Sequence, residues 1–147
     1  MTATVRPIES RDAAVWRDLF TAYGVFYETE FTDPQMDVVW EWLMDSAHPT
    51  KAWVAEIDGA VVGFGHLRRH SDTFTGGPAW YLDDLFTAPA ARGHGVATAI
   101  IASLRAHADA NGGGTISWIT AGDNATAQSV YDKIAARQKW VTYELGE

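Results

Sequence analysis

YLDDLFTAPAARGHGVA, residues 81–97, is the stretch of sequence that decides the fold. Its first part, from Trp80 to Thr87, predicts a β-strand that ends before Pro89. The run Arg92-Gly93-His94-Gly95 predicts a tight turn, and Gly95 to Ala110 has the composition of a buried helix. A strand, a glycine turn and the start of a helix bring several backbone N–H groups to one point, which predicts a phosphate-binding site.

Two other kinds of glycine-rich site do not fit this spacing. A dinucleotide-binding fingerprint requires Gly or Ala three residues after Gly95, where this chain has Thr98. The sequence contains no Gly-Lys-Ser or Gly-Lys-Thr, so a P-loop is excluded. The later run Gly112 to Gly114 follows a helix instead of opening one, and it predicts a helix stop.

Strands and helices alternate along the chain, which predicts one α/β domain over residues 1–147. Asp58-Gly59 predicts a hairpin turn, and Asp33-Pro34 predicts the start of a helix. The expected strands are Val5 to Ile8, Ala52 to Ile57, Ala60 to Arg68, Trp80 to Thr87, Thr115 to Thr120 and Trp140 to Leu145. The other helices are expected to begin at Ser10, at Gly95 and at Asp123 or Asn124, the last ending near Arg137. The first helix carries an aromatic stripe, which favours a core role over a binding role: Trp16, Phe20, Tyr23 and Tyr27.

Two motifs of the chain resemble those of GNAT-superfamily N-acetyltransferases. Arg92-Gly93-His94-Gly95-Val96-Ala97 matches the family's Arg/Gln-x-x-Gly-x-Gly/Ala pyrophosphate motif, and it lies between a strand and a helix as the family requires. Asn124-x-x-Ala127-x-x-x-Tyr131 matches the second family signature. The resemblance implies a mixed, mostly antiparallel, twisted sheet of about six strands flanked by about four helices. Tyr81-Leu82-Asp83-Asp84 most resembles the diamine and polyamine branch, which has Tyr-Leu-Glu-Asp there.

The same resemblance implies acetyl-CoA as the cosubstrate. In the family the pantetheine arm lies between two splayed strands, here 80–87 and 115–120, and pairs with the first. Backbone amides of that strand would bind pantetheine and polarise the thioester carbonyl. The implied cofactor-binding residues are Leu85, Phe86, Thr87, Arg92, Gly93, His94, Gly95, Val96, Ala97, Asn124, Ala127 and Tyr131. Positions 124, 127 and 131 share one helix face, because three and seven residues are nearly whole turns.

Three side chains are candidates for catalysis of a direct attack by a primary amine on the thioester. Tyr131 matches the motif tyrosine and is the expected acid for the departing CoA thiolate, although a Tyr late in a helix is often a core residue. A base is useful because an alkylamine with a pKa of about 10.4 is almost entirely protonated at pH 7. Asp83 stands where the polyamine branch has its glutamate base, with an arm one carbon shorter. Glu28 is a second candidate for base or cation anchor; for each acid the alternative is a solvated surface carboxylate. Asp83 and Asp84 would point to opposite faces of a regular strand, so one of them should reach the cleft.

Composition excludes several functions. The net charge of −8 argues against nucleic acid or an anionic membrane as a partner, and there is no membrane-spanning run of about 20 apolar residues. The chain contains no cysteine, which removes thiolate metal sites and suits a reducing cytoplasm. His66 and His70 would lie about 13 Å apart on a strand, too far to share an ion, so we expect no metal.

The expected acceptor is a small polyamine, diamine or amino-acid-like amine. Residues 28–45 hold six acids and no Lys or Arg, which could attract a cation, although three of these acids also fit the wet face of a helix. Two alternatives remain: acetylation of a protein N-terminus or lysine, and a non-catalytic acyl-CoA-binding module. After the tyrosine motif the family commonly has Leu-Gly-Phe and two strands, whereas Ile134-Ala135-Ala136-Arg137 leads to one expected strand. Part of the acceptor wall could then come from a second subunit, which makes a homodimer plausible.

Overall fold

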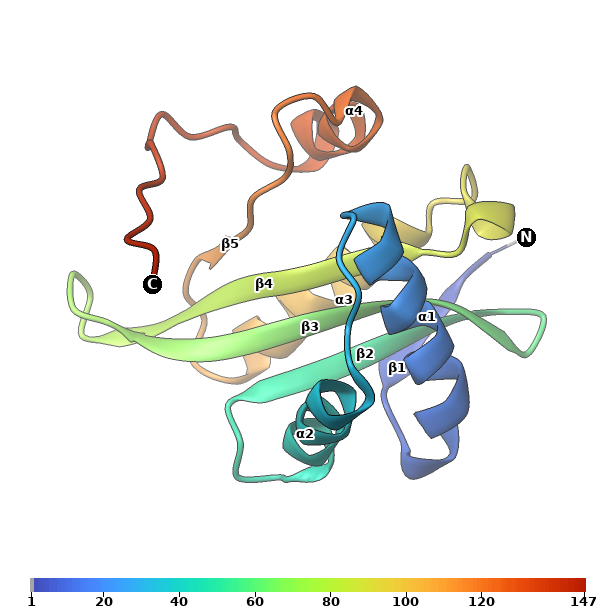
Figure 1. Cartoon of the computed structure of the whole chain (residues 1–147). Helices are drawn as coiled ribbons and strands as arrows, with labels where there is room; N and C mark the ends of the chain where they lie inside the picture. Colours follow the sequence, from blue (N-terminus) through green and yellow to red (C-terminus); the bar gives the residue numbers. More distant parts are fainter. Residues whose placement is uncertain (1) are drawn as a thin grey trace.

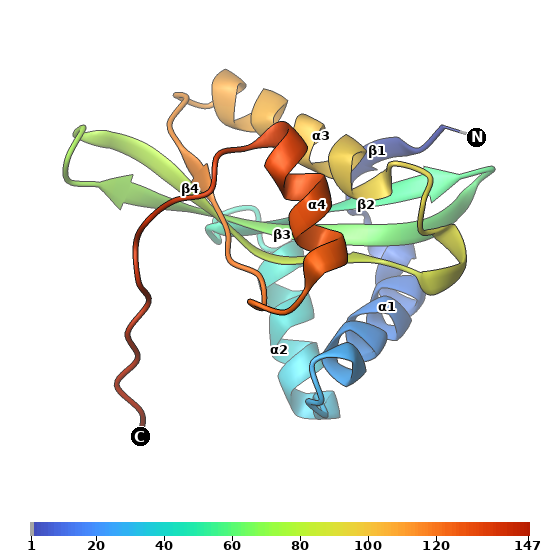
Figure 2. The same cartoon turned by 90° about the horizontal axis from the view of Figure 1, so that it is seen from above.

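A five-stranded sheet with helices on both faces forms the molecule in the computed structural model, which describes residues 2–147 (Figure 1). The strands are β1 (Thr4–Pro7), β2 (Thr50–Ile57), β3 (Ala60–Asp72), β4 (Gly77–Thr87) and β5 (Ile116–Ser117). The helices are α1 (Ala13–Phe26), α2 (Asp33–Met44), α3 (Val96–Ala110) and α4 (Ala125–Ile134), with short 3-10 turns at Ser10–Asp12 and Pro89–Ala91. Seen from above, α1 and α2 cover one face of the sheet and α3 covers the other (Figure 2).

The strands lie in the order β1-β2-β3-β4-β5, and neighbours are antiparallel except β4 and β5, which are parallel. The parallel pairing is short, because it joins Trp80 to Ile116 and Tyr81 to Ser117 and then stops. Beyond Tyr81 no strand formed by residues 2–147 lies beside the outer edge of β4. This gap in the sheet creates the space for the site.

A β-bulge interrupts β4 at the same place. His66 of β3 pairs with Asp84, but its neighbour Leu67 pairs with Leu82, so Asp83 is an extra residue without a partner. A regular strand would send Asp83 and Asp84 to opposite faces. The bulge overturns that prediction, because the two carboxylates reach His66 and Arg68, which are two residues apart on β3.

Apolar side chains fill both faces of the sheet. Trp53, Leu82 and Ile100 belong to the core under α3, whereas Phe20 and Phe64 belong to the core under α1 and α2. Two glycines of β3 let α3 approach closely: a Cβ on Gly63 would lie 2.9 Å from Val96, and one on Gly65 would lie 3.0 Å from Ile100. No helix within residues 2–147 is long and apolar enough to cross a membrane.

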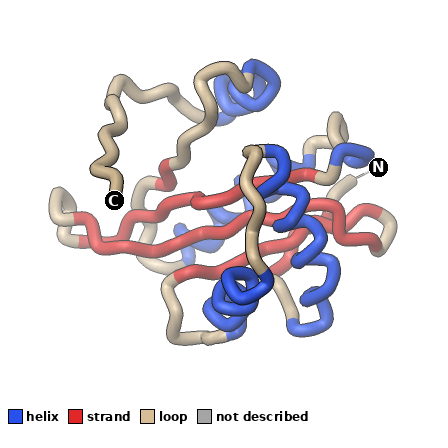
Figure 3. The backbone as a smooth tube through the Cα atoms, in the orientation of Figure 1, coloured by secondary structure: helices blue, strands red, loops and turns tan. Residues whose placement is uncertain are grey.

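The prediction of an α/β, mixed and mostly antiparallel fold is confirmed, with five strands instead of six. The expected strand from Trp140 to Leu145 is an exposed segment that pairs with no strand of residues 2–147 (Figure 3). The strand expected at Thr115 to Thr120 contracts to two residues, and α4 ends at Ile134 instead of near Arg137. A turn of residues 73–76 joins β3 to β4.

Candidate active site

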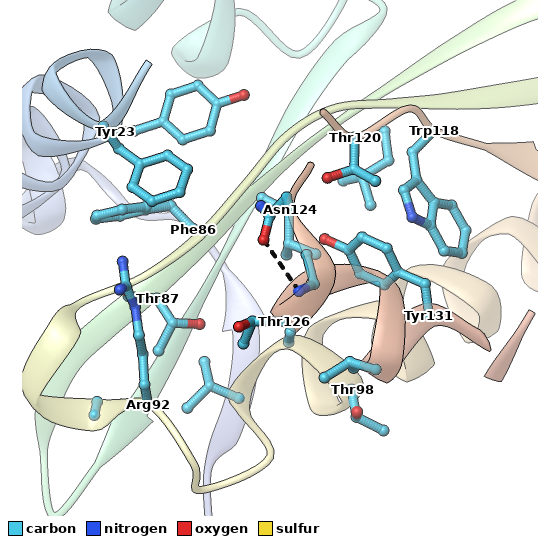
Figure 4. A pocket seen from close by; sticks show the side chains of 18 of the residues that line it. Tyr23, Phe86, Thr87, Arg92, Thr98, Trp118, Thr120, Asn124, Thr126 and Tyr131 are labelled. Carbon is cyan, nitrogen blue, oxygen red and sulfur yellow. Dashed lines mark hydrogen bonds between the residues drawn. The ribbon is translucent and has the colours of Figure 1, made fainter. Parts of the chain in front are cut away.

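A cavity of about 370 Å³ lies where β4 and β5 separate (Figure 4). Its walls come from the end of α1, the second half of β4, the turn before α3, the segment after β5, and α4. Residues far apart in sequence therefore meet around one space. The cavity has three parts: the turn that opens α3, the open edge of β4, and the face of α4.

The first part is the turn that opens α3. Gly93 and Gly95 have φ of 83° and 74°, a conformation that favours glycine, and Gly95 is the N-cap of α3. No side chain in the described part of the chain caps this helix end, and a Cβ at either glycine would point into open space. Free N–H groups and the positive end of the helix dipole therefore face a volume that an anion can enter.

Arg92 adds a positive charge beside this turn. Its guanidinium lies 5.7 Å from the ring centroid of Phe26 and 5.9 Å from that of Phe86, and its Nε donates to the carbonyl of Thr87 at 3.4 Å. Arg92 forms no ion pair with any residue between 2 and 147. Its charge remains available for a phosphate group.

The second part is the open edge of β4. Leu85, Phe86 and Thr87 line the cavity, and the strand that would pair with them is missing because β5 has diverged. A linear amide group placed here can pair with the strand as an added strand does. The edge therefore suits a peptide-like arm such as pantetheine.

The third part is the face of α4. Asn124 is the N-cap of this helix, and its side chain accepts a hydrogen bond from the N–H of Ala127 at 3.2 Å (Figure 4). Tyr131 packs edge-on against Trp118, with ring centroids 5.4 Å apart, and its hydroxyl points toward the middle of the cavity. Burial, followed by the charge of Tyr27, raises the pKa of Tyr131. The phenol is therefore protonated at neutral pH and can act as a proton donor.

Comparison with known proteins supports what this geometry suggests. The sequence profile described as the acetyltransferase (GNAT) family matches residues 16–135. The chain belongs to the GNAT family of acetyltransferases. The family prediction is thus confirmed, while the finer resemblance to the diamine and polyamine branch stays a prediction.

Relatives of this GNAT enzyme act on different amines. The chain is 28% identical over 145 residues to the D-amino-acid N-acetyltransferase HPA3 of Saccharomyces cerevisiae, covering 95% of this chain and 88% of that protein. A ribosomal-protein-alanine N-acetyltransferase from Brucella melitensis has the same fold, with a TM-score of 0.83, 22% identity and full coverage of both chains. The structure of AAC(6')-Iy with a bisubstrate analogue also matches, with a TM-score of 0.86 at 20% identity over 100% of this chain and 99% of that one. The fold is therefore shared among enzymes with different acceptors, and it does not identify the acceptor.

The structure gathers most of the predicted site residues. Those that line the cavity are Asp83, Leu85, Phe86, Thr87, Arg92, Gly93, Gly95, Val96, Ala97, Asn124, Ala127 and Tyr131. His94 is exposed and lies outside this lining. Glu28 follows the end of α1 with a φ of 56°, is exposed, and also lies outside the lining.

An aromatic wall is the part of the site that sequence reasoning missed. Tyr23, Phe26 and Tyr27 line the cavity from the end of α1, and Trp118 lines it from the segment after β5. The helical stripe correctly places Trp16 and Phe20 in the core, whereas Tyr23 packs against that core and also lines the cavity, and Tyr27 lines the cavity. After Gly24 the aromatic residues no longer follow helical spacing, because Phe26 and Tyr27 are adjacent in sequence. This loss of periodicity is the sequence feature that indicates a role outside the core.

The two adjacent carboxylates of β4 have different partners. Asp83 accepts two hydrogen bonds from Arg68, each 3.1 Å long. Asp84 instead bonds to Nδ1 of the buried His66 at 2.8 Å. Residues 2–147 contain no group of three or more His, Asp and Glu side chains placed to hold a metal ion.

Proposed function

We propose that the protein transfers an acetyl group from acetyl-CoA to the primary amine of a small cationic or amino-acid-like acceptor. The observation that carries this proposal is the cavity itself, which combines an uncapped glycine turn, an open strand edge and Tyr131 in one space. The pyrophosphate fits the turn at 92–97, pantetheine fits the edge of β4, and the thioester then lies near α4.

The reaction is a direct attack. The neutral amine nitrogen attacks the thioester carbonyl carbon, whose developing negative charge is stabilised by N–H groups of the β4 edge. The C–S bond then breaks, and the sulfur takes a proton from Tyr131. The raised pKa of Tyr131 keeps this phenol protonated until the sulfur carries charge.

Three observations support a small amine as the acceptor. The wall formed by α1 carries the aromatic residues Tyr23, Phe26 and Tyr27. The faces of such rings attract cations, so this wall suits a small ammonium compound. The net charge of −8 attracts cations in general. A relative that spans nearly the whole chain is a D-amino-acid N-acetyltransferase.

The test is acetyl-CoA turnover against a panel of acceptors, followed as thiol release. The panel contains diamines, polyamines, D- and L-amino acids, an aminoglycoside, and peptides with a free N-terminus or lysine. We expect turnover with at least one small amine and weaker turnover with peptides. A protein that binds acetyl-CoA in calorimetry but acetylates none of the panel contradicts the proposal, and preference for peptides contradicts its acceptor class.

We also propose that two copies of the chain associate through the segment after α4. This segment exposes large apolar side chains, including Trp140 and Tyr143 at 77% and 90% exposure. Its residue types alternate as they do in a β-strand. A second cavity, of about 320 Å³, lies between β5 and residues 135–138. The outer edge of β5 is the one sheet edge beside this apolar segment, so the matching segment of a second copy is the proposed occupant.

Size-exclusion chromatography with light scattering tests this association. We expect a dimer for the full chain and a monomer for a variant lacking residues 139–147. A monomeric full chain contradicts the proposed dimer without bearing on acetyl transfer.

A further inference from the structure

A chain of hydrogen bonds runs from the core of the protein to Asp84, which lies in β4 between Asp83 and Leu85, two residues that line the cavity. Nε1 of Trp16 donates to Nε2 of His66 at 3.0 Å, and Nδ1 of His66 lies 2.8 Å from Oδ2 of Asp84. Trp16 and His66 are buried, with 1% and 2% exposure, whereas the Asp84 side chain is 23% exposed. The chain therefore ends on a carboxylate that solvent and ligands can reach.

The chemistry of these groups fixes the charge of each. An indole N–H can only donate a hydrogen bond, so Nε2 of His66 must be an acceptor and carries no proton. The single ring proton of the neutral imidazole then lies on Nδ1 and is donated to Asp84. A neutral His66 orients Asp84 without cancelling its negative charge.

The adjacent carboxylate, Asp83, does not keep an unbalanced negative charge. Asp83 is bound through both oxygens to Arg68, whose permanent positive charge balances it. Asp84 uses Oδ2 for His66 and accepts a hydrogen bond from the hydroxyl of Tyr23, and neither partner carries a positive charge. The bulge at Asp83 makes this division possible, because it turns both carboxylates toward β3.

Asp84 also lies close to the aromatic wall of the cavity. Burial raises the pKa of Tyr23, and the negative charge of Asp84 raises it further. The same two causes raise the pKa of Tyr27. Tyr23 and Tyr27 pack edge-on with ring centroids 5.0 Å apart, and both line the cavity that contains Tyr131. An unbalanced carboxylate beside two aromatic rings is a favourable place for an ammonium group.

The geometry points to Asp84 as the carboxylate that binds the ammonium group of the acceptor and removes its proton. This inference rests on the proposed acetyl transfer and assigns the base within it. Asp83 lines the cavity, whereas Asp84 lies beside it, but Arg68 balances the charge of Asp83, and Glu28 is exposed and lies outside the lining.

The protons balance as follows. One N–H bond of the ammonium breaks, and its proton passes to Oδ1 of Asp84, directly or through one water. The neutral nitrogen attacks the carbonyl carbon, the C–N bond forms, and the C–S bond breaks with its electron pair on sulfur. Tyr131 donates a proton to that sulfur, and the second proton lost by the nitrogen restores the phenol. Asp84 returns its proton to solvent.

The decisive variants are Asp84→Asn and Asp83→Asn, compared with the amine that wild type acetylates best. We expect Asp84→Asn to lower kcat/KM for the amine by about 100-fold, the effect of losing a general base, while acetyl-CoA affinity changes by less than about threefold. Asp83→Asn should lower kcat/KM for the amine by less than about fivefold. The reverse ranking, or an Asp84→Asn enzyme within about threefold of wild type, overturns the inference.

A second measurement uses the wild-type enzyme and therefore does not depend on the folding of a variant. KM is measured at pH 7 for ethylamine and for its fluorinated analogues, which have nearly the same size but are progressively less protonated. If Asp84 binds the ammonium group, KM rises as the charged fraction of the amine falls. A KM that is unchanged or lower for the neutral analogues contradicts the inference. Absence of thiol release from wild type with every amine would instead reject the proposed function itself.

Discussion

Residues 2–110 and residues 111–147 are built in different ways. The first region contains every buried residue of the described chain, and its last buried side chain is Ala108. The second region contains no buried residue: β5 has two residues, α4 buries none, and the segment after Ile134 is exposed. The proposed coenzyme site lies between the two regions, with the phosphate turn on the first and Tyr131 on the second.

This difference indicates how the enzyme separates stability from catalysis. The first region holds the phosphate turn and Asp84 on a packed sheet, where their positions are fixed before a ligand arrives. In the second region Tyr131 lies on a helix that buries no residue, so the proposed binding of the coenzyme there should stabilise this helix. Changes in the two regions should therefore have different consequences.

The largest effect is expected from removing the hydroxyl of Tyr131. Tyr131→Phe should lower kcat by about 100-fold or more, because the departing thiolate loses its proton donor, while the acetyl-CoA dissociation constant changes by less than about threefold. Steady-state kinetics with calorimetry measures both. Tyr143→Phe, in the exposed segment of the same region, is the matched control and should behave as wild type. Equal kcat values for Tyr131→Phe and wild type would remove Tyr131 from the acid role.

The next effect is on stability, and it distinguishes the two regions directly. Asp12 is 3% exposed and accepts two hydrogen bonds from Arg6, of 2.8 and 2.9 Å. Asp12→Ala should lower the free energy of unfolding by about 2 kcal/mol, because the hydrogen bonds from Arg6 to Asp12 are lost while Arg6 keeps Glu56 as a partner. Asp132, which pairs with Arg137 on the exposed surface, should cost about 0.5 kcal/mol or less when changed to Ala. Urea denaturation measures both, and equal losses would contradict the comparison.

The contribution of Asp12 also depends on pH. The hydrogen bond from Arg6 lowers the pKa of Asp12 in the folded protein. At low pH the Asp12 carboxyl binds more protons in the unfolded protein than in the folded protein. The contribution of Asp12 to stability is therefore complete above about pH 4 and is lost as the pH falls through the lowered pKa of the folded state. Wild type and Asp12→Ala should therefore converge in stability below pH 4, and a gap that widens there would contradict this sign.

A smaller effect is expected at the phosphate turn. Gly95→Ala should weaken acetyl-CoA binding by about tenfold, because its methyl group enters the space proposed for phosphate, whereas the strain of a side chain at φ 74° is present with and without the coenzyme. Gly59→Ala, at φ 80° in the β2–β3 turn, imposes the same kind of strain away from the cavity and is the control. Calorimetry should show weaker binding for the first variant alone. Equal affinities for the two variants would place the phosphates elsewhere.

The sequence predicted the first region well and the second poorly, for a physical reason. The hairpin at Asp58-Gly59 and the glycine turn before α3 are local features that depend on backbone conformation, and the structure has both. A strand after α4 requires pairing with a neighbouring strand, which alternation of side chains cannot reveal, and the expected segment pairs with none within residues 2–147. The bulge at Asp83 is likewise set by pairing between β3 and β4, so the separate partners of the two carboxylates were not predictable. Tyr23 and Tyr27 look like core residues by spacing, and only the position of α1 relative to the sheet places them in the cavity.

Hydrogen–deuterium exchange with and without saturating acetyl-CoA tests most directly whether the coenzyme lies between the two regions. Our account predicts slower exchange at the start of α3 and along Leu85 to Thr87, and the largest slowing in α4, with little change in β1 and β2. Unchanged exchange in α4, at a coenzyme concentration that saturates binding, would contradict it.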